Sequence, residues 1–415
     1  MKRVLIAVGV LVLLAGGALA GAYVWNERKT KDVRGSAETE FETTEEPGAT
    51  TREEEEVEQE PWPTYGFDVQ RTRYASDFEH KPPYRELWKV PVGRLVEFPP
   101  VIAYGRLYFA DTKGRFYAVD AETGEFAWRA SLGASTAASP TVGGGVVYQP
   151  LMNARGTTRA SAPGYMVAMD AETGEERWRF KAGAIESSPL LANGVLYFGT
   201  FDDNLYALDA ETGEERWRFK AGDDIKGGPV LARGTIFFGA YDGKVYAVDA
   251  GNGKRRWDSS AQGGLAGAGN FYATPAAAYG RIFMGNTDGK VYAFGASSGN
   301  LLWSRSTGGF VYSSAAVWNK TVFVGSYDRH LYALDAATGD VRWSFQANDR
   351  ISGPATVLSE VVYFSTFKHK TYGVNARTGK EVWTFPDGRY ANVVADADRV
   401  YLTGVHTVYA LEPEG

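Results

Sequence analysis

Six side chains able to bind a polar ligand fall at one position of a repeated sequence pattern. They are two carboxylates, one ammonium group and three phenols: Glu97, Glu186, Lys226, Tyr272, Tyr312 and Tyr390. Gathered around one axis, such groups would hold a ligand through charge and hydrogen bonds, because ligands bind in concave sites with a few polar groups. A structural alternative stays open, in which Glu186 and Lys226, from adjacent repeats, pair with each other. No residue is predicted to be catalytic.

Three of the four histidines fall on predicted hairpins of consecutive repeats: His330, His369 and His406. Histidines that gather in this way suggest a metal site. No carboxylate accompanies them at a fixed offset, so the sequence favours exposed turn residues and no metal ligand. The chain has no cysteine, which excludes disulfides, a thiolate nucleophile, cysteine-ligated zinc and a lipid thioether.

Eight tryptophans, rather than the candidate ligands, set the architecture. The steps between them are 40, 50, 39, 40, 46, 40 and 40 residues. A period near 40 with strand-like texture predicts one four-stranded propeller blade per repeat. Each tryptophan is expected to pack against a neighbouring blade: Trp88, Trp128, Trp178, Trp217, Trp257, Trp303, Trp343 and Trp383.

The third repeat illustrates the strands of one blade. Short β-rich runs bounded by Asn, Asp and Gly predict strands at 189–191, 195–199, 205–209 and 215–219. The turn before each tryptophan is usually Thr-Gly, and glycine supplies the positive φ that a tight turn needs. The position after the ring of candidate ligands is small in seven repeats and Phe98 in the first, as a crowded axis requires.

The two ends of the repeat region predict how the propeller closes. The third-strand tyrosine motif occurs eight times, but no fourth strand follows its last copy at Tyr409. Residues 85–90 read as a fourth strand that no other strand precedes. This N-terminal strand should complete the C-terminal blade and remove the open seam. The sequence therefore predicts an all-β, eight-bladed propeller of four-stranded antiparallel blades over residues 61–415.

The pattern A-x-D-x-x-T-G-x-x-x-W, which runs from Ala168 to Trp178, resembles the tryptophan-docking motif of PQQ-repeat propellers. The opening residues Trp62–Gly66 and Arg71–Tyr74 are similar to the lead-in of that superfamily. The resemblance covers about residues 62–415. The superfamily includes quinoprotein alcohol dehydrogenases and the outer-membrane assembly factor BamB, so it implies the fold and leaves the activity open.

The resemblance also implies what an enzyme of this superfamily would contain. Its dehydrogenases bind pyrroloquinoline quinone (PQQ) and calcium in the central funnel, with a stacking tryptophan, a catalytic aspartate and often a disulfide. Of the eleven tryptophans here, eight hold the repeat position, and Trp25, Trp62 and Trp318 lie outside the funnel ring. With no cysteine and no tryptophan to stack a quinone, we expect no enzyme and no cofactor.

Residues 1–31 are expected to be a membrane anchor or an export signal. Residues 4–25 form an uncharged apolar run of 22 residues, long enough for a hydrophobic helix to cross a bilayer. In the alternative, residues 4–15 are the core of a cleaved signal peptide and Ala18-Leu19-Ala20 its cleavage site. The propeller would then be an extracytoplasmic domain of a single-pass cell-membrane protein, or a secreted or periplasmic protein.

Residues 32–60 carry twelve acidic residues against two arginines, which predicts a disordered, extended spacer. The remainder, 61–415, holds 37 residues of each charge sign, so no basic field favours nucleic acid as a partner. Two insertions lengthen the minimal repeat, at 151–164 and 263–270. Both belong to connections on the same face of a propeller, where loops often carry binding; neutral variation of loop length is the alternative.

Three functional hypotheses follow. The first is a monomeric, membrane-tethered propeller that binds a protein or another cell-envelope partner without catalysis. The second is a PQQ- and calcium-dependent dehydrogenase that oxidises alcohols or sugars. The third is a ligand-sensing ectodomain, which would need a separate signalling partner.

Overall fold

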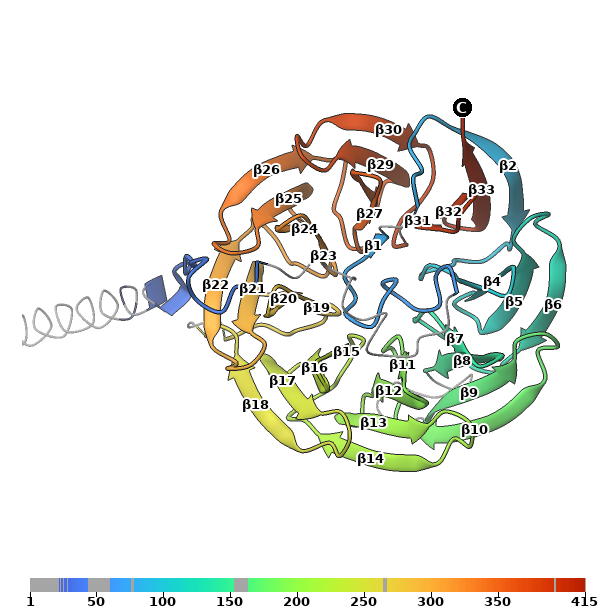
Figure 1. Ribbon diagram of the computed structural model, residues 1–415, viewed down its shortest axis with the longest axis horizontal. Helices are drawn as coiled ribbons and strands as arrows, with labels where there is room; N and C mark the ends of the chain where they lie inside the picture. The colour runs from blue at the N-terminus through green and yellow to red at the C-terminus, as the bar shows by residue number, and fades with distance from the viewer. Residues whose placement is uncertain are drawn as a thin grey trace, which may run out of the picture.

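Eight β-sheets stand around one axis, each with its first strand innermost and its last strand at the rim (Figure 1). The computed structural model describes residues 22, 24, 26, 27, 29–43, 60–75, 78–152, 163–263, 267–391 and 393–414. The sheets are numbered here as blades 1 to 8 in chain order. This architecture is the one that the tryptophan spacing predicts.

The blades contain the following strands, from the axis outward. Blade 1 has β3 (Val101–Ala103), β4 (Arg106–Ala110), β5 (Arg115–Asp120) and β6 (Phe126–Ser131). Blade 2 has β7 (Thr141–Gly143), β8 (Val146–Leu151), β9 (Gly164–Asp170) and β10 (Glu176–Ala182). Blade 3 has β11 (Leu190–Ala192), β12 (Val195–Gly199), β13 (Asn204–Asp209) and β14 (Glu215–Lys220). Blade 4 has β15 (Val230–Ala232), β16 (Thr235–Gly239), β17 (Lys244–Asp249) and β18 (Arg255–Ser260).

The second half repeats the pattern. Blade 5 has β19 (Ala276–Ala278), β20 (Arg281–Gly285), β21 (Lys290–Gly295) and β22 (Leu301–Ser306). Blade 6 has β23 (Ala316–Trp318), β24 (Thr321–Gly325), β25 (His330–Asp335) and β26 (Val341–Gln346). Blade 7 has β27 (Thr356–Leu358), β28 (Val361–Thr366), β29 (Lys370–Asn375) and β30 (Glu381–Phe385). Blade 8 has β31 (Val393–Ala395), β32 (Val400–Thr403), β33 (Thr407–Pro413) and, outermost, β2 (Tyr84–Pro91).

The seam closes as the sequence predicts, because β2 pairs antiparallel with β33 in the register Trp88 to Ala410. The N-terminal strand therefore completes the C-terminal blade, and no sheet edge is left between first and last blades.

The predicted tryptophan packing is confirmed in detail for seven blades. Each indole Nε1 donates a hydrogen bond of 2.9 to 3.3 Å to an alanine carbonyl in the third-to-fourth-strand turn of the next blade. The ring lies on the glycine of that turn, whose φ is between 70° and 77° in all seven cases. Trp383, the eighth, faces the seam, and its ring packs edge-on against Tyr84 at 5.3 Å.

A lead-in segment, residues 60–75, crosses the central opening before the first blade begins (Figure 1). Six of its carbonyls accept hydrogen bonds of 2.8 to 2.9 Å from inner-strand amides of six blades: Ile102, Val142, Leu231, Ala277, Val317 and Val357. Its end forms β1 (Tyr74–Ala75), which adds to β27 of blade 7 in parallel. The sequence does not predict this fifth strand.

Two buried arginines fix the lead-in to the axis. Arg71 donates to the carbonyls of Pro189 at 2.8 Å and of Pro229 at 3.3 Å, and Arg73 donates to that of Ala315 at 3.0 Å. Burial lowers the pKa of Arg71 to about 9, and the neighbouring Arg73 adds to this effect. Both side chains are fully buried. The lead-in therefore seals one end of the axis and leaves the other end open as a funnel.

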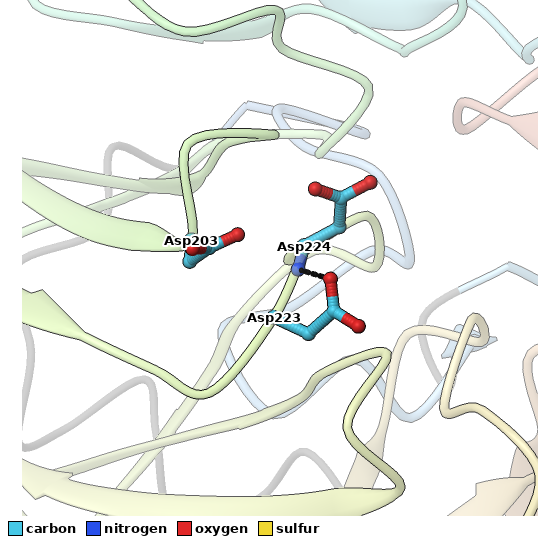
Figure 2. Close-up of side chains that lie close together, drawn as sticks. All are labelled: Asp203, Asp223 and Asp224. Atoms are coloured by element: carbon cyan, nitrogen blue, oxygen red, sulfur yellow. Dashed lines mark hydrogen bonds between the residues drawn. The ribbon is translucent and has the colours of Figure 1, made fainter. Parts of the chain in front are cut away.

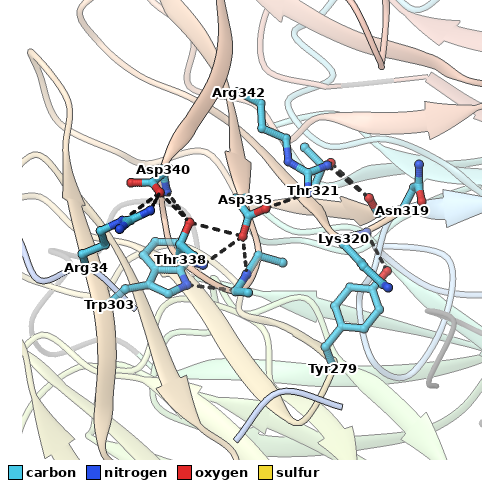
Figure 3. A network of polar contacts seen from close by, with 12 residues as sticks. Arg34, Tyr279, Trp303, Asn319, Lys320, Thr321, Asp335, Thr338, Asp340 and Arg342 are labelled. Atoms are coloured by element: carbon cyan, nitrogen blue, oxygen red, sulfur yellow. Dashed lines mark hydrogen bonds and ion pairs between the residues drawn. The ribbon is translucent and has the colours of Figure 1, made fainter. Parts of the chain in front are cut away.

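Residues 30–42, which we call the strap, follow the outer surface of blade 5. Val33 exchanges backbone and side-chain hydrogen bonds with Ser304 of β22, at 2.9 and 3.0 Å. Gly35 donates to the carbonyl of Thr338 at 3.0 Å, and Arg34 pairs with Asp340 at 2.7 Å (Figure 3). The strap covers Trp303, which is completely buried in consequence.

Arg281 is the centre of the strap contact. Its Nε donates to the Glu40 carbonyl at 2.9 Å, and its Nη2 donates to the carbonyls of Ser36 and Thr39 at 2.8 and 2.6 Å. Its Nη1 donates to the turn of blade 6, at the carbonyls of Ala336 and Ala337. Burial lowers the pKa of Arg281 to about 10. One guanidinium thus binds the strap to two blades.

The strap also supplies a side chain that blade 5 lacks. In most blades an aspartate ends the third strand, and Asp209 for example accepts the Thr212 amide at 2.9 Å. Blade 5 has Gly295 there, and the Glu40 carboxylate fills the space, accepting from Ser298 Oγ at 2.7 and 2.8 Å. For residues 32–43, these contacts replace the extended spacer expected from the acidic composition. The rest of that segment, 44–59, lies outside the described residues.

The predicted anchor or signal segment also falls largely outside the described residues. Among those that are described, no helix is long and apolar enough to cross a membrane.

We expect Gly213→Ala to lower the free energy of unfolding by about 2 kcal/mol or more. Its φ of 74° disfavours alanine, and the new Cβ would stand 2.7 Å from the Trp178 ring. Gly251→Ala is the matched control, because its Cβ would have only an ordinary contact of 3.4 Å. Urea denaturation measures both variants, and equal losses would contradict the docking role of the turn glycine.

Candidate binding site in the propeller funnel

The structure brings all six candidate ligands together in one cavity at the open end of the axis. This funnel pocket has a volume of about 310 Å³. Its lining includes the ring predicted from the repeats: Glu97, Glu186, Lys226, Tyr272, Tyr312 and Tyr390. Each lies in the connection three or four positions before its inner strand, and not at the start of the strand as the sequence predicts, so the repeat geometry still places them around the axis. The volume is at the lower end of the range for small-molecule sites.

The lead-in forms the floor of this pocket. Tyr65 lines it from below, with its hydroxyl 3.4 Å from Ser314 Oγ, and the Arg73 guanidinium lies 4.8 Å from the centre of its ring. A ligand therefore enters from the open face only, because the buried lead-in closes the axis beneath it.

The charged side chains Glu186 and Lys226 of the pocket each contact identified neighbours. The Tyr272 hydroxyl donates to Glu186 Oε1 at 2.8 Å. Burial, followed by the charges of Glu186 and Glu97, raises the pKa of Tyr272 well above its ordinary value, so this donor keeps its proton. The Lys226 ammonium lies 3.8 Å from the Asp224 carboxylate and 4.0 Å from the centre of the Tyr241 ring.

An arc of aromatic rings runs around one half of the pocket. Its centroid distances are 5.2 Å from Tyr272 to Tyr312, 5.0 Å from Tyr312 to Tyr327, 5.6 Å from Tyr327 to Phe367 and 5.2 Å from Phe367 to Tyr390. Tilted and edge-to-face pairs at these distances stabilise one another beyond their buried area. The arc is therefore a fixed surface rather than a set of independent side chains.

Two arginines and one phenylalanine extend the arc outward. Arg350 lies 4.7 Å from the centre of the Phe367 ring, and Arg389 lies 4.8 Å from that of Tyr390. Phe310 packs edge-on against Tyr312 at 6.0 Å, yet 51% of its surface remains exposed. The mouth of the funnel thus presents aromatic and guanidinium groups to the solvent.

A second ring of aromatic residues, not predicted above from the sequence, surrounds this site. Tyr327 and Phe367 come from the hairpins between the second and third strands, as do Phe201 and Tyr241. All four precede the turn at the same repeat position, so an alignment of the hairpins would have found them.

The described ends of the two insertions lie on the face of the funnel mouth. Met152, at the start of the first, donates to the Ser135 carbonyl of an incoming connection at 2.8 Å. Gly269, in the second, packs against the hairpin glycine Gly243 of blade 4. Residues 153–162 and 264–266 lie outside the described residues.

The three histidines lie at hairpins of three different blades. His369 and His406 are exposed on the hairpins of blades 7 and 8, and His330 lies 3.4 Å from Asp328 in blade 6. Within the described part of the chain, the group best placed to hold a cation is Asp203, Asp223 and Asp224 (Figure 2). Lysines already lie near it, with Lys220 2.9 Å from Asp203. These ion pairs account for the acidic cluster.

The lining residues do not fit the cofactors of the dehydrogenases. Calcium takes six to eight oxygen ligands, and the resemblance to the dehydrogenases implies a tryptophan that stacks on the quinone. The funnel pocket offers two carboxylates, Glu97 from blade 1 and Glu186 from blade 3, of which Glu186 accepts the Tyr272 hydroxyl. Among the described residues that line it there is no tryptophan, asparagine or histidine.

Comparison with known proteins gives one family. The model described as outer membrane protein assembly factor BamB matches residues 84–183, 162–309, 262–385 and 304–415. A search of curated proteins found no match.

Solved structures share the fold. BamB from Moraxella catarrhalis is 16% identical with a TM-score of 0.65, and the alignment covers 80% of this chain and 100% of that one. Quinohemoprotein alcohol dehydrogenase from Comamonas testosteroni is 14% identical with a TM-score of 0.69, covering 85% and 80%. A europium-containing methanol dehydrogenase is 11% identical with a TM-score of 0.69, covering 85% and 98%.

We expect Tyr272→Phe to lower the free energy of unfolding by about 1 to 3 kcal/mol, because it removes the hydroxyl that donates to the buried Glu186. Tyr312→Phe is the control, since it removes a hydroxyl from the same ring of residues but leaves that carboxylate's donor in place. Thermal unfolding measures the stability of both variants. If Tyr312→Phe lowers the free energy of unfolding as much as Tyr272→Phe does, Glu186 does not depend on this donor.

Proposed function

Because the chain belongs to the family of outer membrane protein assembly factor BamB, we propose that it is a non-catalytic binding protein whose funnel mouth holds a protein partner. The observation that carries this proposal is the aromatic arc with its exposed extension, Phe310, and its two stacked arginines. Aromatic and arginine side chains dominate the binding energy of protein interfaces.

The geometry of the mouth supports a macromolecular partner over a small ligand. The pocket is small, whereas the aromatic surface extends outward to the exposed Phe310. The arc is already packed before any partner arrives, so little side-chain entropy would be lost on binding. The described ends of the two insertions, Met152 and Gly269, lie at this end of the propeller.

The predicted N-terminal segment adds the location. An anchor over residues 4–25 would hold the propeller on the extracytoplasmic side of a membrane, and the partner would then be a protein of the cell envelope. A cleaved signal would release the same domain outside the cytoplasm.

Site-specific photocrosslinking in intact cells of the source organism tests the partner. With p-benzoylphenylalanine at Phe310, we expect a discrete covalent adduct. Val341 and Val382 are matched control positions, because they are apolar and exposed by 44% and 47% but lie on outer strands. Adducts of the same size and yield at all three positions, or none at Phe310, would refute the funnel mouth as the interface.

The fold shared with quinohemoprotein alcohol dehydrogenase favours one alternative, a PQQ- and calcium-dependent oxidation of alcohols or sugars. We expect saturating PQQ with calcium to leave the melting temperature of the protein unchanged, because the funnel pocket lacks the donor set for both. A clear rise in melting temperature, together with dye-linked oxidation of an alcohol, would establish the alternative instead.

A further inference from the structure

The strap-binding sequence of blade 5 occurs a second time. Blade 5 turns from β19 to β20 through Tyr279-Gly280-Arg281, and blade 1 turns from β3 to β4 through Tyr104-Gly105-Arg106. At the arginine position the other six blades have valine or threonine. Blades 1 and 5 lie on opposite sides of the ring (Figure 1).

The two turns have the same local structure. The φ of Tyr104 is 51° and that of Tyr279 is 54°. Each tyrosine hydroxyl accepts a backbone amide of the next blade, from Gly145 at 2.9 Å and from Lys320 at 2.8 Å. Because backbone and side chain match, the surfaces around the two turns are directly comparable.

The two arginines also point the same way. Arg106 Nη1 donates to the carbonyls of Ala171 and Glu172 in the turn of blade 2, both at 3.0 Å. Arg281 Nη1 makes the equivalent bonds to blade 6, which leaves its Nε and Nη2 for three strap carbonyls. No described segment supplies Arg106 with corresponding carbonyls.

The surface at blade 1 is open where that at blade 5 is filled. Tyr279 is 1% exposed beneath the strap, whereas Tyr104 is 37% exposed. A groove of about 410 Å³ lies between Tyr104, Arg106 and Glu172. We call it the blade 1 groove.

We propose that the blade 1 groove is a docking site for an extended segment of a partner protein, which presents main-chain carbonyls to Arg106 as the strap does to Arg281. This site goes beyond the proposed function, because the turns that form it are at the opposite ends of the strands from the funnel mouth. Main-chain recognition of an extended segment is a common mode of peptide binding.

Acidic side chains around the blade 1 groove disfavour an acidic partner segment. Where blade 5 has Gly295 and receives Glu40, blade 1 already has Asp120, whose side chain accepts the Thr123 amide at 2.8 Å. Glu60 accepts the Tyr104 amide at 2.8 Å beside the same groove. A strap from a second copy would therefore bring carboxylates together, so the occupant is a partner segment with neutral or basic side chains at these positions.

A synthetic peptide tests the site on the full chain. The probe is a fluorescent peptide of residues 34–42 in which Glu40→Ala and Glu42→Lys remove the two conflicting charges. We expect saturable 1:1 binding by fluorescence anisotropy, weakened at least tenfold by Arg106→Val. Valine occupies this position in blades 2, 3, 7 and 8, so the variant should fold. Arg218→Val, which removes an exposed arginine from blade 3, is the control and should bind the probe as the parent does.

A gain-of-binding variant keeps the test independent of any loss of folding. Asp120→Gly gives blade 1 the residue that blade 5 has, so the unmodified 34–42 peptide should bind this variant at least threefold more tightly than it binds the parent chain. The proposal is overturned if Arg106→Val changes the affinity for the probe by less than twofold. It is also overturned if the parent chain does not bind the probe at millimolar concentration. Concentration-dependent dimerisation of the parent chain that the probe abolishes would identify a second copy as the occupant and overturn it too.

Discussion

The structure depends on one contact repeated around the ring: an indole of one blade against the turn glycine of the next. The ring covers a backbone that has no side chain, and its N–H satisfies a carbonyl in the same turn. Both groups lie at the rim, where the gap between radiating blades is widest and needs the largest side chain. Bulk and hydrogen bond together fix the angle between blades at seven junctions, and the packing of Trp383 on Tyr84 fixes the eighth.

This constraint at the rim determines what the axis can contain. With the blades held at fixed angles, the connections that enter the inner strands converge until a Cβ at Gly227 would stand 2.8 Å from the Ala273 carbonyl. Large residues are tolerated one position earlier, where the funnel widens, and the candidate ligands stand there. Hairpins and connections at the same end carry the aromatic arc and the insertions, since loops on a rigid scaffold vary most freely.

What the sequence predicts correctly is what the repeat encodes locally. The predicted strand 195–199 matches β12, and the closing strand 85–90 lies within β2, because turn residues and apolar runs bound each strand within a few positions. The ring of candidate ligands is found in one pocket for the same reason. Local sequence patterns do not predict where the lead-in and the strap bind, because their partners lie up to about 300 positions away in the chain. The acidic composition of the strap predicts solvation, and nothing local indicates that Glu40 substitutes for an aspartate missing from blade 5.

If residues 4–25 lie in a membrane, the strap limits the distance and the orientation of the propeller relative to the bilayer. A free spacer over residues 32–60 would leave the propeller free to move away from the bilayer. The strap begins at residue 30, so only residues 26–29 would separate it from the membrane segment, at most about 14 Å of extended chain. Blade 5, which binds the strap, would then be the blade nearest the lipid surface. The propeller axis would lie parallel to the membrane plane. The funnel mouth would then face other proteins of the same membrane.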